Sequence, residues 1–533
     1  MPDPDPVVLL PEAEYIELYN TSENTVAAAQ WSLSANNRWV ELPSFSLNSG
    51  EYLLLADIQD IGLYGNEIHK KGIESFPVLS NPGATLLLRD GSGRLMHTVT
   101  YEDKWHSDDA KKEGGWSLEM INPREPCLDR ENWVSTENYR GGTPGEVNSV
   151  YDETTDDIPE LWRVAVAESN VLQLYFSESL DSMTTVSGEY YIVDHGLGNP
   201  SEVMPAWPDS KSVELRFDKE FEPNTEYKIQ LTSDICDCSG NTLLQPARGY
   251  FRVPANADSA DIIINEVMYE PDQGFVEFIE LYNTSTNTID LVDFRISVGD
   301  PSGSEQKITE EYWPLHAGEY AVIADDYSGL DDITIFSRAE KIIHMPDMPA
   351  LPNSGNQIYL YKDSLSLSDI VLYTPESHHK ILTETKGVAL ERVSQNTSGL
   401  DSDNWLSASA DAGFMTPARI NSQLNQGKNL SEVSLSSKTL SPNDDGLEDM
   451  LTIRYQLEQE GYMGQVFIFN DRGSLVYRIA DGVLLGAEGV FDFNGRDEEG
   501  KLLPMGFYIV YFNAYHTIMP PFVRKLSFVL VRE

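Results

Sequence analysis

The residues best suited to bind a ligand form the segment "PNDDGLED" near the C-terminal end of the chain. Hard cations such as Ca²⁺ need several oxygen ligands and a glycine that lets the loop fold back, here Gly446. The sequence therefore predicts a calcium site, although its spacing differs from that of an EF-hand. The alternative is a solvated turn, because Asp and Asn are common in turns. The candidate ligands are Asn443, Asp444, Asp445, Glu448 and Asp449.

Other residue types offer weaker chemistry. A second candidate cation site is formed by Asp234, Asp237 and Asn241 around the segment "DCSGN". No nucleophile motif frames a serine or histidine, so we expect no enzymatic activity. The tryptophans could stack on a glycan, or they could pack in cores and between domains.

The three cysteines, Cys127, Cys236 and Cys238, have no zinc-site spacing. A direct bridge between Cys236 and Cys238 would be strained, because they are only two positions apart. A bridge from Cys127 to one of the other two, or three free thiols, are both compatible with the sequence.

The chain is strongly acidic. Its 533 residues contain 37 Lys and Arg against 86 Asp and Glu, which gives a formal net charge of -49. Nucleic-acid binding depends on Lys and Arg that neutralise phosphates, so we expect no nucleic-acid partner. The acidity either serves solubility or collects divalent cations.

Two long segments of the chain repeat one another. "EYIELYNTSENTV" (Glu14–Val26) and "EFIELYNTSTNTI" (Glu277–Ile289) are identical at ten of thirteen positions. Further matches follow in the same order: "LNSGEYLLLAD" with "LHAGEYAVIAD", "ENW" with "DNW", His106 with His378, and "GTPGEVNS" with "MTPARINS". We therefore predict two copies of one domain of about 150 residues.

The repeated blocks read as strands. Ile279 and Leu281 share one face of "EFIELYN", while Phe278, Glu280 and Tyr282 take the other, the two-residue period of a strand covered on one side. We expect Glu280, and Glu17 in the first copy, on an outward face, accepting hydrogen bonds from a neighbouring strand or loop. The alternative is that these two carboxylates bind a partner.

The first copy is shorter than the second by one predicted strand. The second copy begins with "DIIINEVMYEP" (Asp261–Pro271), and nothing in the first copy corresponds to "IIINE". We expect that the natural product continues upstream through this strand to a signal peptide. An uncovered strand edge would also invite pairing with another chain. No apolar run approaches the roughly 18 residues of a membrane helix, and no cleavable signal peptide opens the chain.

The whole chain is predicted to be all-β, with four Ig-like β-sandwich domains in series. Short strands separated by turn residues support this fold class, and helical periodicity is nearly absent. The expected domains are residues 1–150, 157–255, 258–424 and 430–533.

Particular motifs resemble known families. "IIINEV", "EFIELYNTS" and "LHAGEYAVIAD" resemble a bacterial lamin-tail domain, which is an Ig-like sandwich, and Met1–Ser149 resembles a second copy. The "DCSGN" unit between them resembles Ig-like modules of bacterial surface proteins. "SPNDDGLED" and "FNGRDEEGKLLPMGFYIVYF" resemble FlgD-type Ig-like domains and the terminal domains that sort cargo for type IX secretion.

These resemblances imply a non-catalytic secreted or outer-surface protein that acts in binding, adhesion or structural spacing. The expected partner is a protein or a glycan at the cell surface. The alternative is an accessory component of an extracellular hydrolase or nuclease system. No cofactor is expected apart from structural Ca²⁺, and the sequence leaves the oligomeric state open.

Overall fold

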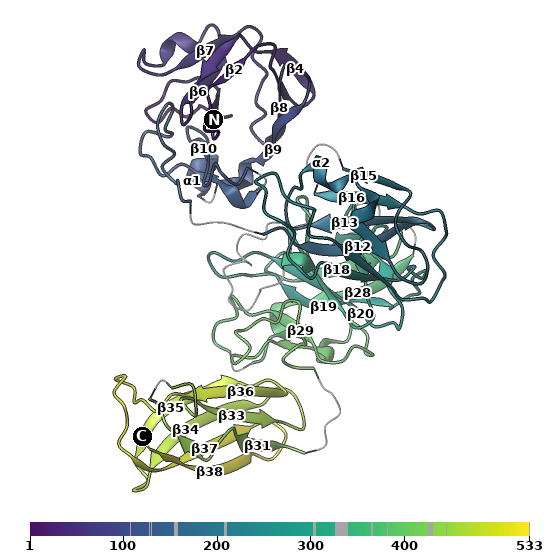
Figure 1. Ribbon diagram of the computed structural model, residues 1–533. Coiled ribbons are helices and arrows are strands. Elements are labelled where there is room, and N and C mark those ends of the chain that lie inside the picture. Colours follow the sequence, from purple (N-terminus) through teal and green to yellow (C-terminus); the bar gives the residue numbers. More distant parts are fainter. Residues whose placement is uncertain are drawn as a thin grey trace. The chain divides into compact units, whose positions relative to one another are not determined.

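The computed structural model describes the chain apart from residues 107, 127, 129, 154–157, 207–210, 302–304, 326–338, 364–365, 381, 425–429, 444 and 532–533, and apart from the side chains of Asp109 and Glu131. Strands dominate the described residues (Figure 1). The all-β, Ig-like fold class predicted from alternating residues is confirmed. The chain divides into two compact units, Met1–Val253 and Pro254–Glu533.

The N-terminal half of the first unit is built from four small sheets. A core cluster that includes Leu33, Leu53 and Leu55 lies among them. In strand order the sheets are β1 (Tyr15–Tyr19), β6 (Tyr52–Asp57) and β7 (Lys70–Ile73); β10 (Leu118–Met120) and β11 (Trp133–Ser135); β4 (Arg38–Glu41), β3 (Ser32–Ala35), β8 (Gly83–Arg89) and β9 (Leu95–Glu102); β2 (Val26–Ala28) and β5 (Phe45–Leu47).

The C-terminal half of the first unit is a sandwich of two antiparallel sheets. Val213, Leu215 and Ile229 are among the alternate residues that fill its core, as expected for strands covered on one face. The sheets are β12 (Leu161–Glu168), β13 (Val171–Phe176), β16 (Ser212–Arg216) and β15 (Glu202–Pro205), and β14 (Tyr191–Val193), β17 (Tyr227–Leu231) and β18 (Arg248–Phe251).

The second unit begins with a six-stranded sheet opposite a four-stranded one. Its central strand β19 (Ile262–Met268) has every side chain buried, because it lies between two neighbours and under a covered face. The larger sheet is β26 (Ile342–His344), β25 (Tyr320–Ala324), β20 (Phe278–Asn283), β19, β29 (Leu390–Arg392) and β30 (Trp405–Ser407). The others are β23 (Gln306–Lys307), β22 (Arg295–Val298), β27 (Asn356–Tyr361) and β28 (Leu367–Tyr373), and β21 (Ile289–Asp290) with β24 (Pro314–Leu315).

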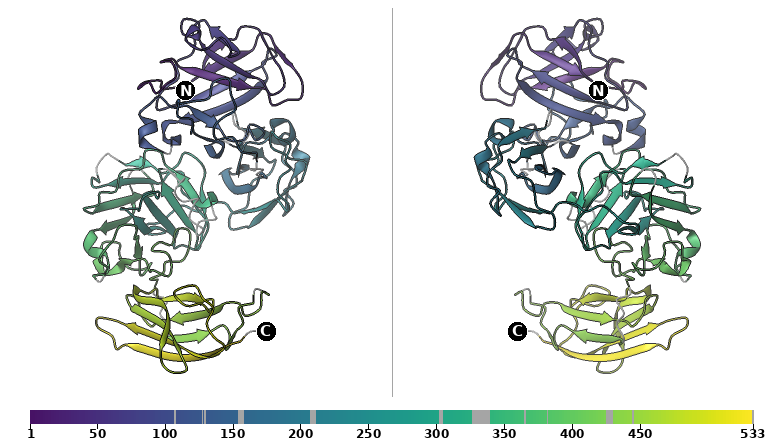
Figure 2. Two further views of the ribbon diagram at one scale, coloured as in Figure 1. Left: turned by 90° about the vertical axis from the view of Figure 1, so that its left-hand side faces the viewer. Right: turned by 90° about the vertical axis from the view of Figure 1, so that its right-hand side faces the viewer.

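The chain ends in a further sandwich, coloured yellow, whose strands form two layers (Figure 2). Val466, Val510 and Phe512 lie in its core. The sheets are β31 (Glu432–Leu435), β33 (Leu451–Gln456) and β36 (Glu488–Phe493), and β32 (Thr439–Leu440), β38 (Phe522–Leu530), β37 (Gly506–Tyr515), β34 (Met463–Asn470) and β35 (Leu475–Leu484).

The described helices are single turns that connect strands. They are α1 (Asp109–Lys112), α2 (Ser182–Thr185) and the 3₁₀ turns Ile61–Leu63, Asp103–Trp105, Arg130–Asn132, Gly188–Tyr190, Ala339–Lys341, Pro375–Ser377 and Ser402–Asn404. Within the described part of the chain, none is long and apolar enough to span a membrane.

Candidate functional site

The two repeated segments build the same sheet with one difference. In the second unit β20, β19 and β29 lie side by side, so β19 joins the two parts of the sheet. In the first unit β1 corresponds to β20 and β10 to β29, but β1 is paired only with β6 and β10 only with β11 among the described strands. The position that β19 fills in the second unit therefore holds no described strand in the first unit.

Met1 marks one end of that position. Its amino group donates a hydrogen bond to the carbonyl of Tyr15 over 2.9 Å, and the Tyr15 N–H donates to the Met1 carbonyl over 3.2 Å. Met268, at the end of β19, pairs in the same way with Phe278, which corresponds to Tyr15. Met1 thus occupies the place of the last residue of β19. Burial lowers the pKa of its amino group to about 5.

A cavity of about 390 Å³ lies beyond Met1, and we call it the β1–β10 groove. Its lining includes apolar side chains from several of the small sheets together with a few polar side chains. The lining residues used below are Met1, Ile16, Glu17, Leu18, Leu86, Leu88, Val99, Leu118, Glu119, Trp133, Thr143 and Asn148.

Apolar side chains in the groove are less covered than their counterparts in the second unit. Ile16 and Leu18 are half-buried, whereas Ile279 and Leu281 at the same positions of β20 are fully buried. The strand registers match Leu86, Leu88, Val99, Leu118 and Trp133 with Ile358, Leu360, Val371, Leu390 and Trp405. All five are half-buried in the first unit and buried in the second. The missing cover is what Ile262 and Ile264 of β19 supply in the second unit.

The groove also holds polar groups in a fixed arrangement. The carboxylate of Glu17 accepts a hydrogen bond from the Gly145 N–H over 2.6 Å, and burial raises its pKa to about 7. Glu119 accepts from the Thr143 hydroxyl over 2.7 Å and from the backbone N–H and hydroxyl of Ser149, each over 2.7 Å. The segment "TPGEVNS" therefore positions both carboxylates.

The second unit contains the completed version of this arrangement. Glu280 accepts from the Ala418 N–H over 2.5 Å, and Glu391 accepts from the hydroxyls of Thr416 and Ser422 over 2.6 and 2.8 Å. β19 adds two groups that have no counterpart among the described residues of the first unit. Asn265 donates to Glu280 over 2.8 Å, and Glu266 accepts from the N–H and hydroxyl of Thr416.

Three carboxylates, Glu266, Glu280 and Glu391, are therefore completely buried in the second unit. Burial raises the pKa of each, and repulsion from neighbouring carboxylates adds to the upward shift of Glu266 and Glu280. Groups with shifted pKa values often mark functional sites, but here the carboxylate oxygens accept hydrogen bonds from backbone, hydroxyl and amide groups. The arrangement joins strands of the sheet to the segment Thr416–Ser422.

The prediction that Glu280 lies on an outward face is wrong. A second apolar layer that includes Phe278, Ala408 and Met415 covers that side of the sheet. The predicted role of Glu280 is confirmed, because it accepts hydrogen bonds from a neighbouring strand and from a loop. Local alternation could not reveal the cover, which comes from a segment more than a hundred residues away.

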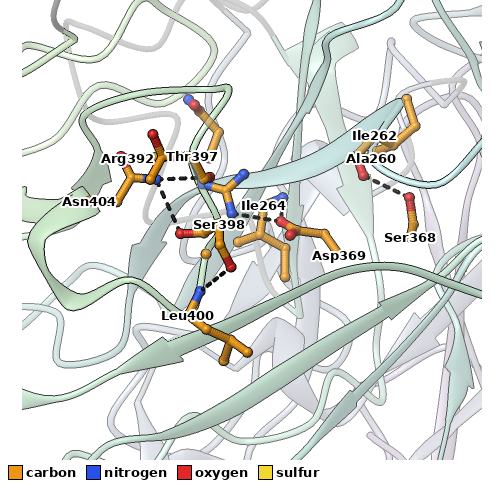
Figure 3. Close-up of polar contacts among 12 residues, drawn as sticks. Ala260, Ile262, Ile264, Ser368, Asp369, Arg392, Thr397, Ser398, Leu400 and Asn404 are labelled. Carbon is orange, nitrogen blue, oxygen red and sulfur yellow. Dashed lines mark hydrogen bonds and ion pairs between the residues drawn. The ribbon is translucent and has the colours of Figure 1, made fainter.

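A buried ion pair between Arg392 and Asp369 also contacts β19 (Figure 3). Nη2 of Arg392 lies 2.9 Å from Oδ2 of Asp369, and the same oxygen accepts from the Ile264 N–H over 2.9 Å. Both side chains are nearly inaccessible. The registers place Met120 and His97 at these positions in the first unit, so this ion pair has no equivalent between the matching described residues.

The paired histidines hold structural positions. His106 lies 2.7 Å from the Ser135 hydroxyl, and His378 lies 2.8 Å from the hydroxyls of both Ser407 and Tyr269. Burial lowers the pKa of each imidazole to about 4. Both rings are therefore neutral hydrogen-bonding groups at neutral pH.

The predicted calcium ligands lie in the loop between β32 and β33. Asp449 accepts from the backbone N–H groups of Asn443 and Gly446 over 2.9 and 2.7 Å, and the Asn443 amide donates to Asp445 over 2.9 Å. Glu448 instead accepts from the Ser437 hydroxyl over 2.5 Å. Asp444 lies outside the described residues. The structure thus brings together Asn443, Asp445 and Asp449.

The weaker candidate site contains a tight turn. Asp237 is buried, and its Oδ1 accepts from the backbone N–H groups of Ser239, Gly240 and Asn241. Asp234 instead accepts from the Thr232 hydroxyl over 3.0 Å. Among the described residues, no group of three or more His, Cys, Asp or Glu is arranged to hold a metal ion.

The cysteines are not equivalent. Cys238 is disulfide-bonded and Cys236 keeps a free thiol, so these two neighbours are not bridged to each other. Cys127 lies outside the described residues.

Three segments match protein-family models. Residues 255–375 match the lamin tail domain, residues 156–253 match a bacterial Ig-like domain, and residues 434–520 match the CHU_C type IX secretion signal domain. These matches confirm one lamin-tail domain, the Ig-like module and the sorting-type C-terminal domain expected from the sequence. No curated protein matches the chain.

Several solved structures share parts of the fold at low similarity. CopC from Methylosinus trichosporium OB3b is 15% identical over 19% of this chain and 95% of its own, with a TM-score of 0.14. The N-terminal part of the bacterial S-layer protein SbsC is 9% identical over 41% and 44%, with a TM-score of 0.19. Dimeric latent PorU from Porphyromonas gingivalis is 9% identical over 75% and 35%, with a TM-score of 0.17.

These scores are too low to support an inference about function. The family matches are more informative, because the C-terminal match concerns a secretion signal domain. The chain is accordingly a secreted or cell-surface protein with a modular all-β fold.

Proposed function

We propose that this protein is a non-catalytic component of the cell surface that acts in binding, adhesion or structural spacing. The observation that carries the proposal is the match of residues 434–520 to a type IX secretion signal domain. β-Sandwich domains in series suit this role, because rigid sheets can present loops and strand edges to a partner. In this proposal the modules span residues 1–150, 157–255, 258–424 and 430–533.

We further propose that Met1–Ser149 is a second lamin-tail-like domain. The support comes from matched interactions as well as from the repeated sequence. Gly145 N–H contacts Glu17 as Ala418 N–H contacts Glu280, and Thr143 contacts Glu119 as Thr416 contacts Glu391. Unrelated sandwiches would not share these long-range hydrogen bonds at matching sequence positions.

A non-catalytic role is supported by the environment of the acidic side chains. The buried carboxylates in the second unit accept hydrogen bonds from backbone N–H groups, hydroxyls and an amide. Such contacts suit a structural network better than general acid–base catalysis, which needs a group within reach of a substrate. The expected partner is a protein or a glycan at the cell surface.

Localisation tests this proposal directly. Full-length protein and a variant lacking residues 430–533 are expressed in the native host, and intact cells are treated with an external protease. We expect the full-length protein to be degraded or released from the surface and the shortened protein to stay protected inside the cell. Equal protection of both proteins would overturn the proposal, and turnover of a substrate by purified protein would overturn its non-catalytic part.

A further inference from the structure

The larger sheet of the C-terminal sandwich has apolar side chains on both of its faces. Val466, Ile468 and Val510 lie in the core, on the face that the other sheet covers. The alternate residues of β34 and β37 point away from the core, because successive side chains of a strand take opposite faces. The half-buried or exposed apolar residues of this outer set, which we call the aromatic face, are Phe467, Phe469, Phe507, Ile509 and Tyr511.

The rings of the aromatic face hold one another in place. The rings of Phe467 and Tyr511 are stacked, with their centroids 6.4 Å apart. Phe469 meets both rings edge-on, with centroid distances of 6.4 Å to Phe467 and 6.2 Å to Tyr511. Side chains that are already ordered by their neighbours lose little rotamer freedom when a ligand binds. The three rings therefore form a preorganised surface.

One row of residues across this face has a cation on each side of the rings. The strand register places Lys525 of β38 beside Tyr511, and on the other side it places Arg478 of β35 beside Phe467. The Lys525 ammonium lies 5.8 Å from the centroid of the Tyr511 ring and has no ion-pair partner among the described residues. Nη1 of Arg478 lies 2.8 Å from Glu498, which leaves other N–H groups of this exposed guanidinium to donate.

The neighbouring row of the same face is polar. The side-chain amide of Asn513 donates to Gln465 over 3.1 Å, and the Gln465 amide donates to Asp481 over 2.9 Å. Each amide nitrogen carries two N–H groups, so each can donate a further hydrogen bond. The aromatic face thus combines ring surfaces, cations and hydrogen-bonding groups on one side of a flat sheet.

We propose that the aromatic face binds an acidic polysaccharide, whose sugar rings stack on Phe467 and Tyr511 and whose carboxylates meet the flanking cations. This proposal rests on the binding role proposed above and names the chemical class of the partner. The C–H faces of sugar rings are apolar and pack on aromatic rings, while their hydroxyl groups can accept hydrogen bonds from the adjacent amides. Each part of such a ligand therefore has a matching group on this face.

The size of the aromatic face favours a polysaccharide over a protein partner. A whole aromatic side chain has about 200 Å² of surface, so the exposed fractions of the five apolar side chains amount to roughly 400 Å². A stable protein complex buries about 800 Å² on each partner. An oligosaccharide that lies on two or three rings needs much less apolar area.

The charges of the face favour an acidic ligand. The chain has a formal net charge of -49, so exposed cations on both sides of one row are a local exception. Repulsion from carboxylates elsewhere on the chain is screened beyond about 8 Å at physiological salt. Lys525 and Arg478 are close enough to a ligand on the rings to form charge-assisted hydrogen bonds with its carboxylates.

A hexamer of galacturonate and its methyl ester provide the test, because they share their sugar rings and differ in charge. Binding of each hexamer to the full chain is measured by titration calorimetry. We expect saturable binding of the galacturonate hexamer and about tenfold weaker binding of the methyl ester, since the ester cannot pair with the cations. Polyglutamate, which carries carboxylates without sugar rings, should bind much more weakly than the galacturonate hexamer.

Variants separate the stacking surface from the cations. Phe467→Thr and Tyr511→Thr keep a residue suited to a strand and should each weaken the binding of both hexamers about tenfold. Lys525→Gln should weaken the galacturonate hexamer several-fold and leave the binding of the methyl ester unchanged. Arg454→Gln is the matched control, because Arg454 is an exposed cation on β33 of the other sheet, and it should bind like the original chain.

Chemical acetylation of lysines locates the bound hexamer. We expect the galacturonate hexamer to protect Lys525 from acetylation and to leave Lys386, an exposed lysine of the preceding domain, fully reactive. This measurement and the comparison of the two hexamers use the original chain, so they remain decisive if a variant fails to fold.

Several results would overturn the proposal. They are absence of binding by the galacturonate hexamer, equal affinity for its methyl ester or for polyglutamate, and unchanged acetylation of Lys525. Self-association of the chain that Tyr511→Thr abolishes would also overturn it, because the aromatic face would then be covered by a second copy. Each of these results leaves the surface localisation test unaffected.

Discussion

Asn265 and Asn421 lie 156 positions apart, and Nδ2 of Asn265 is 2.5 Å from Oδ1 of Asn421. Asn421 in turn donates to the backbone carbonyls of Asn265 and Arg392 over 3.1 and 2.9 Å. One buried amide therefore joins β19, β29 and the segment that covers the sheet. Asn148, at the same position of the repeat, donates to the Met120 carbonyl over 2.9 Å.

Replacement of Asn421 should therefore be costlier than replacement of Asn148. Asn421→Ala removes one of the two acceptors of the Asn265 amide and the donor to two backbone carbonyls, and each net hydrogen bond contributes about 1 kcal/mol, or more where a group is left buried. We expect the free energy of unfolding of the second unit to fall by about 3 kcal/mol and that of the first unit by about 1 kcal/mol for Asn148→Ala. Calorimetry of the full chain measures both changes, and equal losses of stability for the two variants would contradict this prediction.

The Arg392–Asp369 pair predicts strong coupling between two positions. Arg392→Met, which introduces the residue found at the matching position Met120, leaves the Asp369 carboxylate buried without its cation. Loss of one partner of a buried ion pair typically costs about 3 kcal/mol or more. We therefore expect a marked decrease in the melting temperature of the second unit.

The double variant is the control for this pair. Arg392→Met combined with Asp369→Leu removes both charges, and apolar replacement of a buried pair is often neutral or stabilising. We expect the double variant to recover most of the lost stability, although the Ile264 N–H then loses its acceptor. Additive effects of the two substitutions would show that the residues act independently.

The carboxylate cluster gives a specific pH dependence. Burial and repulsion hold the pKa of Glu266 well above its ordinary value in the folded state. Between the unfolded and the folded pKa, the folded state binds more protons, so the stability contributed by this group decreases as pH rises. We expect Glu266→Gln to gain stability relative to the original chain as pH increases from 5 to 8.

Comparison with the variant isolates this effect from the histidines. His378 has a lowered pKa and acts in the opposite direction, because stability is lost as pH falls below the unfolded value and His378 must become charged. Both proteins retain His378, so its contribution cancels in the difference between their free energies of unfolding. A difference that is constant from pH 5 to 8 would mean that Glu266 is ionised in the folded protein.

Much of the fold could be predicted from the sequence because alternation is a local signal. The repeat placed Glu17 with Glu280 and His106 with His378, and the absence of "IIINE" from the first copy predicted the unfilled position beside β1. Burial of Glu280 could not be predicted, since the layer that includes Met415 is brought over the sheet by tertiary packing. The Arg392–Asp369 pair was missed for the same reason, although Asp369 directly before the apolar run Ile370–Leu372 of β28 was a usable signal.

The predicted calcium site in the loop after β32 can be tested by measuring thermal stability with and without Ca²⁺. The hypothesis of a calcium site predicts that millimolar Ca²⁺ raises the melting temperature of the C-terminal sandwich, because a ligand that binds only the folded state stabilises it. Asp445→Ala should abolish the shift, since it removes a carboxylate that lies beside Asn443. Serine at position 437 pairs with Glu448, so Ser437→Ala is a control that should keep the shift. An unchanged melting temperature in the original chain would leave the loop a hydrogen-bonded turn.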